Sequence, residues 1–322
     1  MKKLIILLLA FLGILIGCSH EEILEYNMFY RYENNEYIDI NFYKNGSEEN
    51  ANDILCLIDY WNIMLDHEHV NDTKNNLAAL NVNKYATLDA ELVELIEYTI
   101  DLSTSYKTVN PLYGTLKDLW DLHMITEELP TENECLTQIE VSLSTRVAIN
   151  GNDVHLLGDG LIDLDYIKKG FIGEKIKEYL ISKGIDRYVI NYNADLVLYG
   201  KNKNGGSFET SFYGMKNGTY NLSDITLVRV TADNNCFYTK DGRRWADIPS
   251  FVTGVPNDTF ETLFVLGDNA LKNSILAYAY YSLEVEDVKL DEEKSNIMFA
   301  GYRDKNLVYR SVKLENLLVD ER

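Results

Sequence analysis

The sequence is short of basic residues and of proline. Its 322 residues carry 30 lysines and arginines against 51 acidic residues, a net charge of −21. Nucleic-acid phosphates and anionic membrane surfaces are both bound through a surplus of lysine and arginine, so we expect neither a nucleic-acid partner nor a polybasic membrane patch. With only 4 prolines and 46% hydrophobic residues, the composition argues against disorder and indicates a globular chain able to bury a full core.

Cysteine is also scarce, with 4 in the chain. Cys56, Cys135 and Cys236 lie far apart and lack Cys-x-x-Cys spacing. We therefore predict neither a disulfide framework nor a cysteine-based zinc site, and we interpret the three as packing residues.

Histidine occurs 5 times, and one acidic segment holds the only His-x-His, formed by His67 and His69. We interpret this segment as solvated surface. A Gly-x-Ser-x-Gly nucleophile elbow and glycine loops with phosphate-binding spacing do not occur in the sequence, so neither motif supplies a function.

The chain begins with two lysines and an apolar run from Leu4 to Ile16, followed by Gly17 and Cys18. A charged start and a short apolar segment are typical of a secretory signal, and the run is shorter than the roughly 20 residues of a membrane-spanning helix. A small residue followed by cysteine resembles a bacterial lipoprotein signal. That likeness implies cleavage after residue 17, palmitate-type acylation of Cys18, and a membrane anchor facing outside the cytoplasm. An uncleaved N-terminal anchor with an incidental cysteine is the alternative, and it too would export the chain.

The rest of the chain alternates between helical and strand patterns without a repeat or an internal linker. Period-two alternation predicts a strand over 36–43, whereas helical spacing predicts helices over 52–65, 89–105, 173–182 and 268–283. Further strands are predicted over 138–148, 154–157, 187–191 and 196–199, with antiparallel sheet over 205–229 and a closing hairpin after 296. This mixed order indicates an α+β class and three regions: a signal over 1–17, a tether over 18–26 and one domain over 27–322.

Four segments carry more information than periodicity. They read YKTVNPLYGTL at 106–116, IDLDYIKKGF at 162–171, INYNAD at 190–195, and DGRRW at 241–245 with TGVP at 253–256. In this order they resemble the motifs TxGAFDPTxGPL, IDLGGIAKGY, VNxGGN and DGKRYHHIIDPRTGYP of the ApbE family, the FAD:protein FMN transferases. The resemblance implies a single α+β domain, related to the T-fold, with a mixed antiparallel sheet and packed helices.

The resemblance also implies a chemistry. Family members bind FAD and Mg²⁺, and a threonine or serine hydroxyl of a target protein attacks the pyrophosphate. FMN is then joined to that residue through a phosphoester, and AMP leaves; some relatives mainly hydrolyse FAD. The implied partners are therefore FAD, a target protein with an FMN-accepting residue, and the membrane that holds the anchor.

Residue by residue, the resemblance assigns a candidate site. Lys169 is the motif lysine, a catalytic cation that also meets the nucleotide, and Tyr166 stands where a main-chain carbonyl ligates the metal. The remaining FAD-binding positions of the family correspond to Thr108, Val109, Asn110, Asp163, Gly170, Asn193, Ile248, Thr253 and Gly254.

The departures from the family pattern fall on the metal and on its histidine. The family's late-helix Asp-x-x-x-Thr ligand pair is aligned with Asn273 and Ala277, and its histidine with Asp247, which we take as the second catalytic candidate. Asp247 together with Asp195 is one hypothesis for a rebuilt acidic site. Three functions therefore stay open: an exported flavin transferase, a non-catalytic relative that binds flavin or a partner protein, and a surface lipoprotein without flavin.

Overall fold

The computed structural model describes residues 24–33, 35–212, 218–232, 236–246, 248–257, 259–292 and 298–320. The predicted signal, Cys18 and Asp247 lie outside these residues. Within them, no helix combines the length and apolar character that crossing a bilayer requires.

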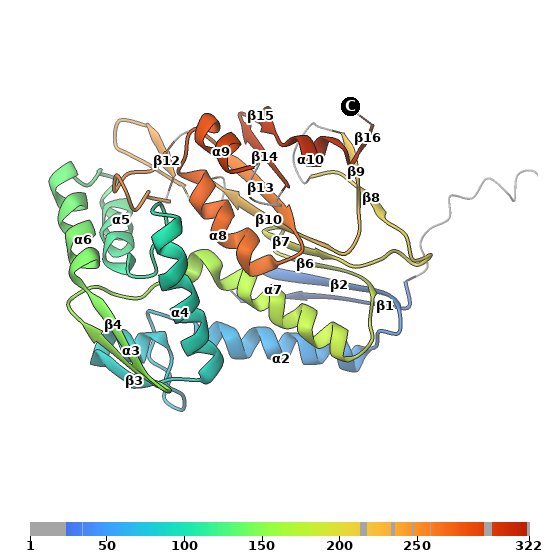
Figure 1. Ribbon diagram of the computed structural model, residues 1–322, viewed down its shortest axis with the longest axis horizontal. Coiled ribbons are helices and arrows are strands. Elements are labelled where there is room, and N and C mark those ends of the chain that lie inside the picture. The colour runs from blue at the N-terminus through green and yellow to red at the C-terminus, as the bar shows by residue number, and fades with distance from the viewer. Residues whose placement is uncertain are drawn as a thin grey trace, which may run out of the picture.

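An eight-stranded antiparallel sheet forms the centre of the molecule, in the order β1-β2-β6-β7-β10-β13-β14-β15 (Figure 1). Its strands are β1 Tyr26–Arg31, β2 Tyr37–Lys44, β6 Arg187–Tyr192, β7 Leu196–Tyr199, β10 Ile225–Thr231, β13 Thr262–Gly267, β14 Met298–Arg303 and β15 Asn306–Arg310. Every residue of β13 is buried, because alternate side chains enter two separate apolar clusters on the two faces of the sheet. The sheet is therefore covered on both sides at this strand.

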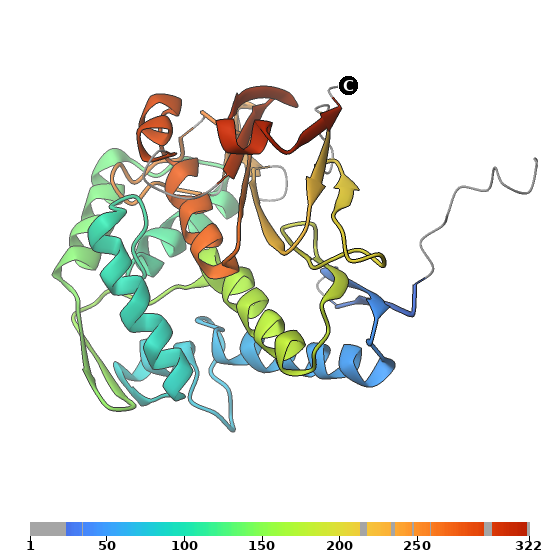
Figure 2. The ribbon, with the colours of Figure 1, turned by 45° about the vertical axis from the view of Figure 1, so that its right-hand side comes forward.

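Three long helices lie over one face of the sheet: α2 Glu48–Met64, α7 Asp165–Ser182 and α8 Ala270–Tyr281 (Figures 1 and 2). α7 packs against both α2 and α8, while α8 rests on β10 and β13. Trp61 of α2 meets Phe171 of α7 edge to face, with ring centroids 4.7 Å apart. This packing fixes the beginning of α7, where the IDLDYIKKGF segment lies.

The remaining elements gather around this core. A helical group stands at one end, formed by α3 Leu77–Asn83, α4 Ala90–Ser105, α5 Gly114–Thr126 and α6 Glu132–Ser144. One small sheet consists of β3 Tyr85–Thr87, β5 Asp153–Leu157 and β4 Arg146–Asn150. A second consists of β16 Leu318–Asp320, β9 Thr219–Leu222 and β8 Phe208–Thr210. A third pairs β11 Cys236–Tyr238 with β12 Arg244–Ala246. Two short helices, α9 Val285–Glu292 and α10 Val312–Glu315, lie near the C-terminus.

The α+β class is confirmed, but two predicted elements are wrong in part. Residues 138–144 belong to α6 and not to a strand, since a capping box between Thr131 and Glu134 starts a helix that buries Cys135, Ile139 and Ser142 at helical spacing. α7 begins eight residues earlier than predicted, at Asp165, so the IDLDYIKKGF segment is largely helical.

The prediction that the cysteines are packing residues is also wrong in part. All three described cysteines are free; Cys135 is buried as expected, but Cys56 is exposed and is therefore not a core packing residue.

Candidate functional site

Two of the motif segments run side by side before α7 begins. Tyr113 and Leu161 form a parallel bridge, and the backbone N–H of Asp163 donates to the carbonyl of Pro111 at 2.9 Å. Thr108 Oγ1 donates to the carbonyl of Ala279 on α8 at 3.1 Å. These bonds bring the 106–116 and 162–171 segments to one end of α8.

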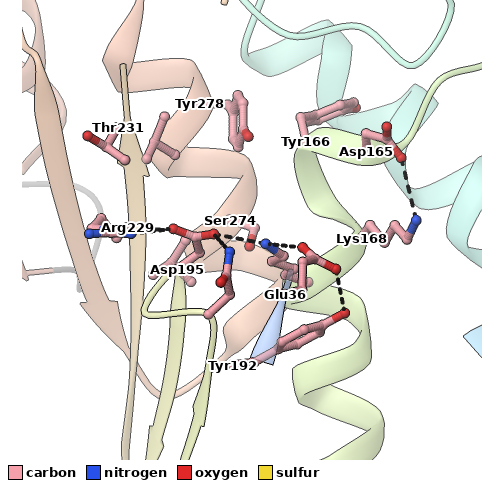
Figure 3. A pocket seen from close by; sticks show the side chains of 14 residues that line it. Glu36, Asp165, Tyr166, Lys168, Tyr192, Asp195, Arg229, Thr231, Ser274 and Tyr278 are labelled. Carbon is pink, nitrogen blue, oxygen red and sulfur yellow. Dashed lines mark hydrogen bonds and ion pairs between the residues drawn. The ribbon is translucent and has the colours of Figure 1, made fainter. Parts of the chain in front are cut away.

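A cavity of about 300 Å³ opens among the start of α7, the turn between β6 and β7, β10 and α8 (Figure 3). Its wall includes three acidic side chains and three basic ones: Glu36, Asp165, Asp195, Lys168, Lys169 and Arg229. The equal numbers distinguish this cavity from the acidic chain as a whole, and cationic groups in such a wall are what an anionic ligand requires.

Asp195 is the centre of this polar network. Its Oδ2 accepts from Lys169 Nζ at 2.8 Å and its Oδ1 from Arg229 Nη2 at 2.8 Å, while Glu36 Oε1 lies 2.8 Å from the same Lys169 nitrogen. Burial disfavours the charged form of Lys169, but the carboxylates of Asp195 and Glu36 outweigh it and raise the pKa of Lys169 above its usual value. Lys169 is therefore a permanent cation in the cavity wall.

A second, smaller cavity of about 20 Å³ adjoins the first. Thr108, Val109, Asn110 and Ile248, all predicted FAD contacts, line it. The structure thus brings these four residues together from two distant segments.

Tyr166 and Tyr278 line both cavities and stand between them. Their rings meet edge to face with centroids 5.8 Å apart, one from α7 and the other from α8. Burial raises the pKa of each phenol well above its usual value, so both stay protonated at neutral pH.

The face that α8 presents to the larger cavity differs from the expected one by one residue. Ser274 and Tyr278 line the cavity, whereas Asn273 and Ala277 are buried and do not. The side-chain amide of Asn273 instead donates to the carbonyl of Thr226 at 3.0 Å. The structure therefore does not place the expected metal ligands Asn273 and Ala277 at the site.

The turn between β6 and β7 carries Asn193 and Ala194 in left-handed backbone conformations, with φ of 55° and 57°. The family has two glycines at this place, as the resemblance implies, and glycine adopts this region freely. Asn193 tolerates it and donates from Nδ2 to Asp195 Oδ2 at 3.1 Å. Ala194 carries the strain, and the turn keeps its shape without glycine.

Two of the predicted FAD-binding residues have structural contacts instead. A Cβ placed on Gly170 would lie 2.2 Å from Ser274 Oγ and 2.6 Å from the carbonyl of Ala270, so this glycine allows α7 and α8 to approach. Asp163 is fully buried, and its Oδ1 accepts from the backbone N–H of Asp165 at 2.8 Å. Neither residue lines the two cavities.

The Thr253-Gly254 pair also lies outside both cavities. The carbonyl of Gly254 accepts a hydrogen bond from Trp120 Nε1 at 2.8 Å. A Cβ placed on Gly254 would meet the side chain of Cys135 on α6, so the backbone packs closely there. This turn holds the 248–257 segment against α5 and α6.

His67 is the residue that the sequence interpretation missed. The side chain of His69 is 79% exposed, as expected of a solvated segment, but that of His67 is only 10% exposed. His67 Nε2 lies 3.8 Å from Asp163 Oδ2, and His67 Nδ1 lies 3.8 Å from Asp165 Oδ2. The acidic sequence around it gave no signal, because its partners lie almost a hundred residues away.

Comparison with known proteins gives a consistent picture. The model of the ApbE family matches residues 39–297. A curated FAD:protein FMN transferase of Vibrio cholerae is 22% identical over 173 residues, which cover 51% of this chain and 52% of that protein. The chain thus spans about half the length of this curated relative.

Solved structures share the fold at low sequence identity. An ApbE protein of Thermotoga maritima superposes with a TM-score of 0.77 at 15% identity, over 92% of this chain and 99% of that one. The flavinyl transferase ApbE of Pseudomonas stutzeri gives a TM-score of 0.74 at 13% identity, over 91% and 96%. Together with the motifs and the family match over most of its length, these findings show that the chain belongs to the ApbE family.

Proposed function

We propose that this protein binds FAD at the two adjoining cavities and transfers FMN to a threonine or serine hydroxyl of another exported protein, with release of AMP. Family membership and the name of the Vibrio cholerae relative support the reaction class. The observation that carries the proposal is that one cavity collects Thr108, Asn110 and Ile248 while the next holds Lys169 and Asn193. Residues from four separate motifs thus line two adjoining cavities.

The transfer replaces one phosphorus–oxygen bond by another. The acceptor oxygen bonds to the FMN phosphorus, the bond from that phosphorus to the bridging oxygen breaks, AMP leaves with the bridging oxygen, and the hydroxyl proton passes to water. Negative charge accumulates on phosphoryl oxygens during this step, and preorganised cations stabilise it. Lys168, Lys169 and Arg229 are the cations of the wall. The pyrophosphate would compete with Asp195 for Lys169.

Mg²⁺ held as the resemblance implies does not fit the residues present. The helix face at the cavity offers Ser274 and Tyr278, and neither carries a carboxylate. Mg²⁺ is usually bound through one or two carboxylates in near-octahedral geometry. Asp195, an acid of the same wall, is already engaged by Lys169 and Arg229. We therefore assign no step of the reaction to Mg²⁺ at this place.

A second candidate function is flavin binding without transfer, and the α8 face supports it because Ser274 and Tyr278 offer no carboxylate for a metal ion. Tyr166 stands where the family motif has glycine, Tyr278 follows the position aligned with the motif's threonine, and the two rings leave the smaller cavity only about 20 Å³. Pockets for ligands of ordinary size have volumes of roughly 300–1,000 Å³, so FAD can occupy both cavities only if these rings move.

Titration of FAD into the protein from residue 19 onward, followed by measurement of AMP, separates the candidates. Binding with AMP release that requires an added exported acceptor domain supports the transferase, and binding without AMP in the presence of that domain supports the flavin-holding protein. Absence of binding contradicts both and leaves a lipoprotein without a flavin role.

We propose further that the protein is anchored through Cys18 on the outer side of a bacterial cell membrane. The support is the apolar segment that ends at Gly17-Cys18. Two acyl signals give stable anchoring where one chain binds only marginally. The Cys18→Ala variant is expected in the soluble fraction, whereas its recovery with the membrane would contradict lipidation at this residue.

A further inference from the structure

His67, Asp163 and Asp165 form a compact cluster outside the network of Asp195. One ligand atom from each residue, an imidazole nitrogen and two carboxylate oxygens, lies within 4.8 Å of the others. His67 comes from the loop between α2 and α3, and the two aspartates stand at the start of α7. Two segments that lie almost a hundred residues apart in the sequence thus converge on one small volume.

One buried atom in the cluster has no hydrogen-bond partner among the described residues. Asp163 is 0% exposed and its Oδ1 is used by the backbone of Asp165, but its Oδ2 accepts no hydrogen bond. That oxygen faces His67 Nε2 at 3.8 Å. Leaving a buried carboxylate oxygen without a hydrogen bond is costly, and a bound cation is one of the groups that satisfies it.

Hydrogen bonds hold the two halves of the cluster in register. Asn81 Nδ2 donates to the carbonyl of Ile162 at 2.8 Å, and the N–H of Ile162 donates to Asn81 Oδ1 at 2.8 Å. In the other half, Asp66 Oδ1 accepts from the backbone N–H groups of Glu68 and His69, each at 2.9 Å. The position of His67 is therefore set before any ligand arrives.

We propose that His67, Asp163 and Asp165 bind a divalent transition-metal ion such as Zn²⁺ or Mn²⁺. A ligand set of one imidazole and two carboxylates suits these ions better than Ca²⁺ or Mg²⁺, which take oxygen ligands almost exclusively. Ligand atoms about 2.0–2.2 Å from a tetrahedral Zn²⁺ stand roughly 3.4 Å from one another, so the three ligand atoms, which lie within 4.8 Å of one another, need to close by at most about 1.4 Å. Asp165 is 53% exposed, which gives the ion an entry path from solvent.

The site is separate from the helix positions at which the family resemblance places Mg²⁺. Asp165 is the one residue that belongs both to the cluster and to the wall of the larger cavity. A bound ion would therefore add positive charge beside the proposed FAD site. The binding itself does not depend on whether the protein transfers FMN.

The test is titration of the full chain, freed of metal with EDTA, with ZnCl₂, MnCl₂ and MgCl₂ in the absence of FAD. We expect one equivalent of Zn²⁺ or Mn²⁺ to bind and to raise the melting temperature. His67→Ala is expected to lower the affinity at least tenfold, and His69→Ala, the matched control in the same loop, to change it less than twofold. Circular dichroism verifies that both variants are folded, and Asp165→Asn provides a second ligand variant at an exposed position.

Several results of these titrations would overturn the proposed metal site. No binding of Zn²⁺ or Mn²⁺, unchanged affinity in folded His67→Ala and Asp165→Asn, or equal loss in His67→Ala and His69→Ala would overturn the site. Tighter binding of Mg²⁺ than of Zn²⁺ and Mn²⁺ would overturn the assigned class of ion. Because FAD is absent from every titration, these outcomes are independent of the proposed transferase activity.

Discussion

Tyr166 of α7 and Tyr278 of α8 meet edge to face, with ring centroids 5.8 Å apart and an interplanar angle of 68°. Both side chains line the larger cavity and the smaller one, so the contact is the wall between them. An aromatic pair of this geometry adds about 0.5–1.5 kcal/mol beyond the burial of its surface. The access of FAD to both cavities therefore depends on how readily these rings separate.

Replacing Tyr278 by threonine is expected to join the two cavities. Because the tyrosine ring no longer separates them, we expect FAD affinity to rise at least tenfold, at a cost to the free energy of unfolding of roughly 2 kcal/mol for the lost packing. Isothermal titration gives the affinity. Tyr278→Phe keeps the ring and serves as the control, with wild-type affinity expected. Equal affinities in the threonine and phenylalanine variants would contradict the role of the ring.

Lys169 is expected to be required for FAD binding. It is held by Asp195 and Glu36 at 2.8 Å each, so Lys169→Met removes a cation from the wall and leaves two carboxylates facing the pyrophosphate. We expect FAD affinity to fall more than tenfold and the free energy of unfolding to fall by about 1–2 kcal/mol, since this ion pair is partly solvated. Lys175→Met on the same helix, whose partners are Glu91 and Glu178, is the control. Equal FAD affinity in both variants would contradict the assignment.

Gly170 is expected to be a packing residue. A methyl group there would lie 2.6 Å from the carbonyl oxygen of Ala270, and backbone cannot yield as a side chain can. Gly170→Ala should therefore lower the free energy of unfolding by about 1–3 kcal/mol, measured by chemical denaturation. Gly184→Ala would test strain without a clash, since no atom lies within 4 Å there but φ is +68°. A Gly170→Ala variant of wild-type stability that loses only FAD affinity would support the nucleotide contact instead.

The sequence predicted which residues line the two cavities better than it predicted the register of α8. The motifs placed Lys169, Asn193, Thr108 and Ile248 at adjoining cavities, because a motif carries its own local geometry. The motifs did not predict which residues of α8 face the cavity. A shift of one residue along a helix turns a side chain by about 100°, so Ser274 lines the cavity where Asn273 was expected.

Long-range contacts set the other limit. His67 faces Asp163 through tertiary packing, and nothing in its acidic neighbours indicates that partner. The strand predicted over 138–148 failed for a related reason, because β-branched and apolar residues of α6 are compatible with either period until Cys135 and Ile139 are buried against the rest of the helical group.

Asp163 gives a prediction for the pH dependence of stability. Burial raises its pKa from 3.8 to about 6, the charge of Asp165 adds to the shift, and His67 opposes it. Because the pKa of this carboxyl is higher in the folded protein than in the unfolded protein, its titration favours the folded protein below pH 3.8. This contribution is lost as the pH rises through about 6, where the buried carboxyl ionises. In the metal-free protein, Asp163→Asn should therefore raise the free energy of unfolding at pH 8, on the order of 2 kcal/mol, and by less at pH 5.

Urea denaturation in EDTA at the two pH values measures this difference. The exposed Asp101 of α4 provides the control, because Asp101→Asn is expected to change stability little at either pH and Asp101 does not contribute to the pKa shift of Asp163. A gain in Asp163→Asn that is the same at pH 5 and pH 8 would contradict a raised pKa.

The most direct test of the central claim is in-gel flavin fluorescence of an exported acceptor domain after incubation with this protein and FAD. The account predicts covalent fluorescence on the acceptor, its loss when the accepting threonine becomes alanine, and AMP equal in amount to the attached FMN. FAD binding without covalent fluorescence or AMP would contradict transfer and make this chain a flavin-holding member of the ApbE family.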